Sequence, residues 1–172
     1  MTSLFGKDNE SVLSAAASWF RKAAEQGNVD AQFSLGVAYE DGQGVQTNLT
    51  EAIKWLTKSA ENGNLQAAGR LAMYYFFGSG EDKNIQEGIR WLRFGAERGD
   101  VLDQTTLALI LRGGGFPFHD IEIEKDPNEA AKWYLRAARQ GDGDAQISIG
   151  EMYAQGEGVM QDFVEACAPQ SG

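Results

Sequence analysis

The chain has 172 residues, 42% hydrophobic and 10% aromatic, which is enough for one domain with a substantial core and too apolar for intrinsic disorder. Its 15 basic and 25 acidic residues give a net charge of −10. This charge argues against nucleic acid and anionic membranes as partners, because phosphate binding needs clustered Lys and Arg, and it mildly favours a basic partner. A single cysteine, Cys167, excludes an internal disulfide framework and a cysteine-rich zinc site.

The first residues, MTSLFGKDNESV, carry no apolar run after a basic segment and are unlike a signal peptide. No window holds the roughly 18 apolar residues that a membrane-spanning helix needs. We therefore expect no membrane insertion and a cytoplasmic location, or a periplasmic one if a leader has been removed.

A repeat runs through the chain and is marked by its tryptophans. They are Trp19, Trp55, Trp91 and Trp133, at spacings of 36, 36 and 42 residues. Eight residues after each stands a glycine, namely Gly27, Gly63, Gly99 and Gly141. Such a fixed column indicates an internal repeat of about 36 residues.

A second column indicates where a helix begins. Asn48, Asn84 and Asp126 each precede a tryptophan by seven residues, and each is followed three residues later by a glutamate. This pattern predicts a helix N-cap with a capping box, in which the glutamate side chain bonds back to the N–H group of the cap. Each repeat thus contains a helix of about 14 residues, here called helix B, which the column glycine ends.

A shorter segment precedes each helix B. Its copies begin at Ala31, Ala67, Asp103 and Ala145, and apolar residues recur in them at helical spacing. Each copy carries a small residue five positions further on, which would let two helices approach closely; these residues are Gly36, Ala72, Ala108 and Gly150. We predict a second helix here, called helix A, ending in a G-x-G turn.

A unit of two helices leaves an apolar face that only a neighbouring unit can cover, so the repeat predicts an all-α solenoid forming a single domain, with about four repeats of 36 residues. The tryptophans are expected to be core wedges between stacked helices. The predicted units are a partial repeat at 1–30, repeats at 31–66 and 67–102, a repeat with a six-residue insertion at 103–144, and a partial repeat at 145–172.

The pattern resembles the Sel-one-like repeat, a relative of the tetratricopeptide repeat. In the first full copy it is carried by Ala31, Leu35, Gly36, Tyr39, Gly42, Gly44, Val45, Ala52, Trp55, Ala60 and Gly63. In the last copy it is carried by Ala145, Gly150, Tyr153, Gly156, Gly158, Val159 and Ala166. The resemblance implies a right-handed superhelix of antiparallel helix pairs that acts as a protein-binding scaffold, with no catalytic residues. Some bacterial relatives act as immunity proteins, so a dedicated inhibitor or immunity protein is the alternative function.

The two ends depart from the pattern. By register, Gly6 falls at a turn position, so the first unit lacks its helix A. Pro169 stands where a fifth tryptophan would fall, and proline there breaks a helix. We expect half repeats at both ends, and we slightly favour a piece of a longer solenoid over non-standard caps.

The insertion lies in Gly113–Ile123. Its three glycines align with the G-x-G turn and lack the Lys-Ser/Thr that completes a phosphate loop. His119 has no second His or Cys nearby, so we expect an exposed loop histidine and no metal site, cofactor or catalytic group. Phe116 and Phe118, with Ile121 and Ile123, either fold onto the neighbouring repeat or present a contact edge.

The remaining candidate site is the face of helix A, which is concave in tetratricopeptide-like solenoids. Its predicted partner-binding residues are Phe33, Val37, Glu40, Met73, Phe76, Phe77, Leu109, Arg112, Ile147 and Glu151. Apolar residues rimmed by charge are typical of a binding groove, although one or both of Phe76 and Phe77 could instead fill gaps between repeats. We therefore predict a non-catalytic scaffold for a partner protein or peptide; a hydrolase is disfavoured.

Overall fold

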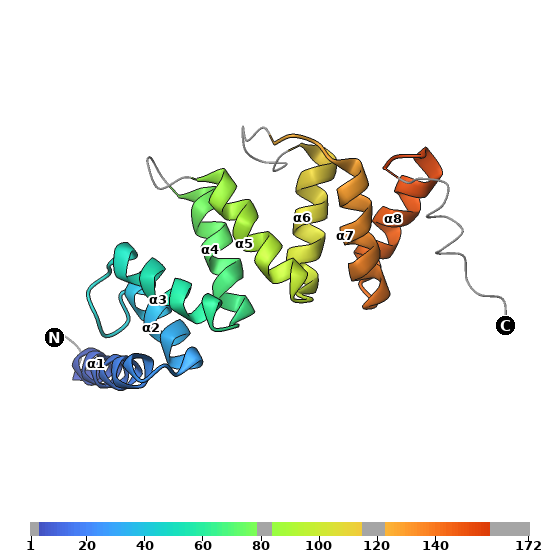
Figure 1. The fold of residues 1–172 in the computed structure, drawn as a ribbon. Helices are drawn as coiled ribbons and strands as arrows, with labels where there is room; N and C mark the ends of the chain where they lie inside the picture. The colour runs from blue at the N-terminus through green and yellow to red at the C-terminus, as the bar shows by residue number, and fades with distance from the viewer. Residues whose placement is uncertain (1–3, 79–83, 115–122, 159–172) are drawn as a thin grey trace. The chain divides into compact units, whose positions relative to one another are not determined.

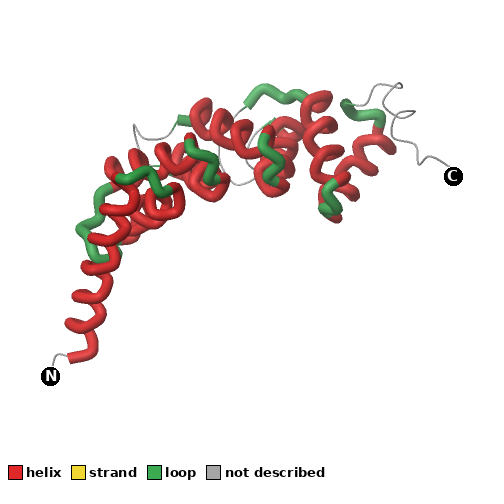
Figure 2. The backbone as a smooth tube through the Cα atoms, turned by 60° about the horizontal axis from the view of Figure 1, so that its bottom comes forward, coloured by secondary structure: helices red, strands yellow, loops and turns green. Residues whose placement is uncertain are grey.

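The computed structural model describes residues 4–78, 84–114 and 123–158, with side chains from Glu10 onward. Helices joined by short loops make up these residues, and no strand occurs among them (Figures 1 and 2). The helices are α1 Leu4–Glu25, α2 Val29–Asp41, α3 Leu49–Glu61, α4 Leu65–Phe77, α5 Ile85–Glu97, α6 Val101–Gly113, α7 Pro127–Arg139 and α8 Gly143–Gln155. Helices α3, α5 and α7 are copies of helix B, and α2, α4, α6 and α8 are copies of helix A.

The chain forms two compact units, Met1–Asn84 with α1 to α4 and Ile85–Gly172 with α5 to α8. Within each unit every helix packs against the next one along the chain. This confirms the α-solenoid of helix pairs that the repeat predicts. The prediction of a single solenoid domain stays a prediction.

Side-chain caps fix where these helices begin. Six caps accept a hydrogen bond from the backbone N–H three residues further on, at 2.7–3.1 Å; they are Asn28, Asn48, Asn64, Asp100, Asp126 and Asp142. At the other end of the helix B copies, the column glycines have φ angles of +89° to +100°. The predicted caps Asn48 and Asp126 and the glycine ends are confirmed, whereas a cap at Asn84 stays a prediction. Each helix B after the first is 13 residues long.

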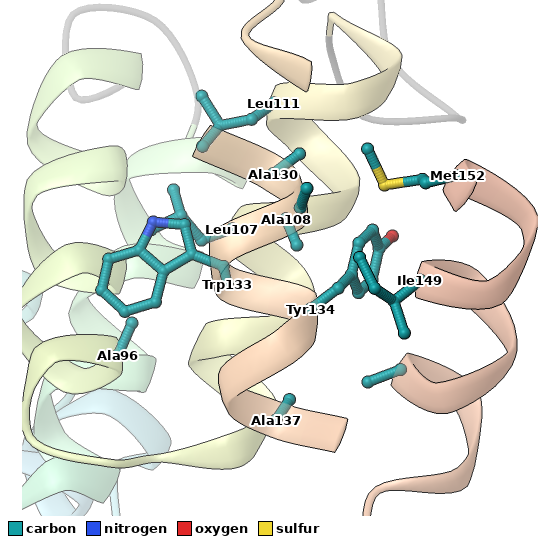
Figure 3. Close-up of a cluster of buried hydrophobic side chains, with 12 residues drawn as sticks. Ala96, Leu107, Ala108, Leu111, Ala130, Trp133, Tyr134, Ala137, Ile149 and Met152 are labelled. Carbon is teal, nitrogen blue, oxygen red and sulfur yellow. The ribbon is translucent and has the colours of Figure 1, made fainter. Parts of the chain in front are cut away.

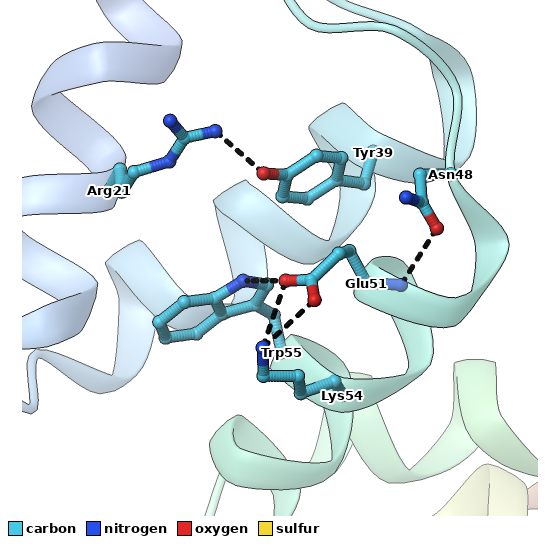
Figure 4. Close-up of polar contacts among 6 residues, drawn as sticks. All are labelled: Arg21, Tyr39, Asn48, Glu51, Lys54 and Trp55. Carbon is cyan, nitrogen blue, oxygen red and sulfur yellow. Dashed lines mark hydrogen bonds and ion pairs between the residues drawn. The ribbon is translucent and has the colours of Figure 1, made fainter.

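The prediction of a capping box is wrong in one respect: the glutamate side chain does not bond back to the N–H group of the cap. The carboxylate of Glu51 accepts hydrogen bonds from Trp55 Nε1 at 3.2 Å and from Lys54 Nζ at 2.8 Å, rather than from the cap (Figure 4). The N–H of Asn48 instead donates to the carbonyl of Tyr39 on α2 at 2.9 Å. Because helix A already satisfies this N–H, the glutamate is free to hold the tryptophan.

The core confirms three of the four tryptophan wedges. Trp55, Trp91 and Trp133 are all buried. In the second unit, Trp133 belongs to a cluster that includes Leu107 and Leu111 of α6, the preceding helix A (Figure 3). These three tryptophans therefore fill space in the core between neighbouring helices, as predicted.

Trp19 contradicts the wedge prediction, because 69% of its surface is exposed. The predicted turn at Gly6 is also wrong, since α1 runs unbroken from Leu4 to Glu25. In the other repeats a predicted cap residue stands seven positions before the tryptophan and a glutamate stands four positions before it. Before Trp19 these two positions hold Val12 and Ala15. Without a cap nothing starts a new helix there, and within the described residues no helix A covers the indole.

The backbone of the G-x-G turn lies against the backbone of a neighbouring helix. Gly44 has a φ of +71°, and a Cβ atom on it would overlap the backbone carbonyl of Leu13 in α1. Gly158 has a φ of +64° and stands in the same relation to Pro127 of α7. The turn therefore needs glycine both for its conformation and for the space that a side chain would take.

We expect Gly44→Ala to lower the free energy of unfolding by at least about 2 kcal/mol, since it combines a left-handed backbone strain with an overlap that only backbone movement can relieve. Urea titration followed by circular dichroism measures the loss. Gly63→Ala is the matched control, because its φ is +100° but no atom lies within 4 Å of the added Cβ. An equal loss in the two variants would show that the overlap of the added Cβ with Leu13 does not lower the free energy of unfolding.

Candidate functional site

The face of helix A in the second unit contains a cleft between α6 and α8, above α7. Its volume is about 530 Å³. The α6 wall includes Leu102, Thr105 and Leu109, and Ser148 stands on α8. Leu102 is 73% exposed and Leu109 is 45% exposed, so two leucines face solvent beside a hollow. Exposed apolar side chains around a concavity are typical of a binding surface.

Tyr134 of α7 also lines the cleft. Burial raises the pKa of its phenol, and a hydrogen bond with Ser148 opposes that rise. The tyrosine is therefore neutral at physiological pH, and its hydroxyl is hydrogen-bonded to Ser148 within the protein.

Arg112 ties α6 to the end of α8. Its Nε donates to Glu157 at 3.0 Å, Nη1 to Glu151 at 3.3 Å and Nη2 to Gln155 at 3.4 Å. Burial works against the charge of Arg112, but the hydrogen bonds to Glu157 and Glu151 outweigh it and raise its pKa further. Arg112 and Glu151 are therefore engaged with each other, and a direct contact of either with a partner stays a prediction.

The equivalent face of the first unit, between α2 and α4, differs at several positions, and one of them carries a long charged side chain. Arg70 occupies the column of Thr106 and Ser148. Its Nη1 donates to Glu40 Oε2 at 2.6 Å, and its guanidinium lies 5.9 Å from the centre of the Phe33 ring. The long side chain spans from α4 to α2 where the second unit has small residues, so it covers the surface that is open in the second unit.

The other predicted residues lie in different environments. Val37 is half-buried, Met73 and Phe77 are exposed on α4, and Ile147 is exposed on α8. Phe76 is only 1% exposed and is among the largest fully buried side chains. Its place in the partner-binding set is therefore wrong, because it fills the core instead. Phe116, Phe118 and His119 lie outside the described residues.

Among the described residues, no three His, Cys, Asp or Glu side chains gather as a metal ion would require. None of the helices formed by these residues combines the length and hydropathy needed to cross a bilayer. The feature that the described chain does offer is a cleft with exposed apolar side chains, in a chain of short helix pairs. The molecule belongs to the class of α-solenoid repeat proteins.

Within that class, the model of the Sel1 repeat matches residues 4–28, 29–64, 65–100, 115–142 and 143–168. These five matches cover most of the chain, which therefore belongs to the Sel1 repeat family. Sel1 repeat proteins generally mediate protein–protein interactions, and their scaffold is typically non-catalytic.

Solved structures agree with the assignment. The Sel1 repeat protein from Oxalobacter formigenes is 37% identical, with a TM-score of 0.70, over 86% of this chain and 58% of that one. The c5321 protein, a protective antigen of uropathogenic Escherichia coli with an SLR fold, is 39% identical, with a TM-score of 0.62, over 88% of this chain and 31% of that one. The chain thus spans about three fifths and one third of these two structures.

A more remote similarity links the chain to the immunity protein Pa5087 from Pseudomonas aeruginosa, at 16% identity and a TM-score of 0.39. At this level the similarity carries no argument about function. No curated protein sequence is similar enough to this chain to count as a match.

Proposed function

We propose that this chain is a non-catalytic scaffold that binds a partner protein or peptide on the helix A face, with the α6–α8 cleft as a contact site. The observation that carries the proposal is the pairing of exposed Leu102 and Leu109 with a hollow of about 530 Å³. Apolar anchors that enter a pocket contribute much of the affinity of protein interfaces. The net charge of −10 favours a basic partner.

The first unit supports this choice of cleft by contrast. There the bridge from Arg70 to Glu40 spans the equivalent surface. A partner would have to displace a charged hydrogen bond to enter, whereas in the second unit Thr106 and Ser148 leave the space open. We therefore assign the main contact to the second unit.

Selection of random dodecamer peptides displayed on phage, with the full chain as bait, tests the proposal. We expect enriched peptides whose affinity, measured by fluorescence anisotropy, falls about tenfold on Leu109→Ser, because an apolar contact of roughly 1–2 kcal/mol is lost. Leu49→Ser is the matched control: Leu49 and Leu109 are both 45% exposed, and Leu49 lies on α3. Peptides that bind both variants as well as the unchanged protein would overturn the assignment of the cleft.

A further inference from the structure

The cleft between α6 and α8 is acidic at the end where both helices begin. Asp142 and Asp144 line it there, and among the described residues neither Lys nor Arg lines the cleft. Asp142 caps α8, with its Oδ1 accepting from the Ala145 N–H at 2.7 Å. Asp144 is exposed, and within the described chain no hydrogen bond or ion pair engages its carboxylate. The negative charge at this end is therefore only partly compensated, by the start of the helix.

Capping does not require this charge. Asn28 and Asn64 cap α2 and α4 in the first unit through the same hydrogen bond, at 2.8 and 3.0 Å. The negative charge of Asp142 is therefore additional to its role as a cap, which an asparagine could fill. Two positions after each cap, the first unit has Asp30 and Gln66, and the second has Leu102 and Asp144. The cap and cap+2 positions thus carry one carboxylate in the first unit and three in the second, with Asp100 as the third.

The apolar part of the cleft lies close to these charges. Leu102 and Leu109 are seven residues apart on α6, which is about 10 Å along a helix. An extended peptide covers that distance in about three residues. A segment that seats an apolar side chain against Leu109 would therefore bring a residue two to four positions away to the acidic end. At the far end Arg112 is already paired with Glu151 and Glu157, so its own charge is compensated and opposes a basic segment little.

We infer that the occupant of the cleft is a peptide segment with an apolar side chain and, two to four residues from it, a Lys or Arg that reaches Asp142 and Asp144. This inference rests on the proposed function, since it names the chemistry of the partner at the same cleft. The apolar side chain is held by Leu102, Leu109 and Tyr134, and the basic group by the two carboxylates. Such ion pairs contribute more to selection among partners than to total affinity.

The dodecamer selection also tests this inference. Enriched peptides should carry an apolar residue with Lys or Arg two to four positions away. Their affinity at 50 mM salt should fall about threefold to tenfold in Asp142→Asn/Asp144→Asn, and the difference should shrink at 500 mM salt. The fold is expected to tolerate the double variant, because Asn28 and Asn64 already act as caps at the equivalent positions. Asp30→Asn is the matched control, since it removes one carboxylate at the position of Asp144 in the first unit.

The outcomes separate the two proposals. Peptides that lose affinity on Leu109→Ser but carry no basic residue, or keep full affinity for the Asp142→Asn/Asp144→Asn variant, would overturn the basic partner and leave the cleft as a binding site. Loss of affinity in Asp30→Asn equal to that in the double variant would show a general charge effect and would also overturn the inference. Peptides whose affinity changes neither with Leu109→Ser nor with the aspartate changes would overturn both the proposed function and this inference.

Discussion

Trp133→Ala is expected to lower the free energy of unfolding by about 3–5 kcal/mol, the largest loss from any single truncation proposed for this chain. The indole is buried among Leu107, Leu111 and the alanines of α6 and α7, so its removal opens a cavity. Its Nε1 also donates to Glu129 at 3.0 Å. Glu129 is in turn paired with both terminal nitrogens of Arg93 on α5. The Trp133 side chain thus packs between α6 and α7 and also hydrogen-bonds to the glutamate that forms the ion pair between α5 and α7.

Trp19→Ala is the control for this prediction. The same residue type in the same column is 69% exposed, so its removal should change the free energy of unfolding by less than about 1 kcal/mol. Urea unfolding followed by circular dichroism, which does not depend on the tryptophans themselves, measures both variants. Similar losses at Trp19 and Trp133 would contradict the account of why one is a wedge and the other is not.

A change of Asp103 to Asn is expected to stabilise the protein at pH 8 by about 1–3 kcal/mol. Asp103 is 5% exposed, and within the described residues its Oδ2 has no hydrogen-bond partner. Burial, with the Asp100 carboxylate nearby, raises its pKa from 3.8 to about 7. The folded protein therefore binds this proton more tightly than the unfolded chain. The stability that the proton contributes is complete below about pH 4 and is lost as the pH rises through about 7.

The stability of the unchanged protein should thus fall between pH 4 and 8 more steeply than that of Asp103→Asn, with the curves converging at low pH. Chemical unfolding at pH 4.5, 6, 7 and 8 gives the comparison. Parallel curves would mean that Asp103 is ionised in the fold at no cost.

The neighbour of Asp103 supplies an independent check. Gly95 of α5 has no side chain, and a Cβ atom there would overlap the Asp103 carboxylate. The corresponding pair in the last repeat is Ala137 and Ala145, so Gly95→Ala/Asp103→Ala restores the ordinary pair. We expect Gly95→Ala alone to destabilise the protein and the double change to stabilise it, a non-additivity that a double-mutant cycle measures. Additive effects would show that the two residues do not share this space.

Local signals in the sequence predicted most of the fold. Caps such as Asn48 and Asp126, and the glycines that follow helix B, act within one turn, so their spacing defined the helix ends. The carboxylate of Glu51 could not be placed in this way. Its hydrogen bond depends on whether helix A has already satisfied the N–H group of the cap, and that is a property of two packed helices.

The candidate site was predictable in part. The helical register placed Leu109 on the open face, and it lines the cleft. The same register placed Phe76 there, although its side chain lies in the core. Alignment assigns a face but cannot tell how deeply a large side chain sinks between helices. The location of the cleft did have a signal in the sequence: one column holds Ser34, Arg70, Thr106 and Ser148, and the residue that bridges the surface in the first unit stands out by size and charge.

The most direct test of a binding cleft in the second unit is methyl NMR of the full chain titrated with an enriched dodecamer peptide. The resonances of Val101, Leu102 and Leu109 should shift on saturation, while that of Val12, which is exposed on α1, should stay in place. Shifts at Val12 with unchanged resonances at the cleft would place the binding surface on the exposed face of α1, and would contradict the account.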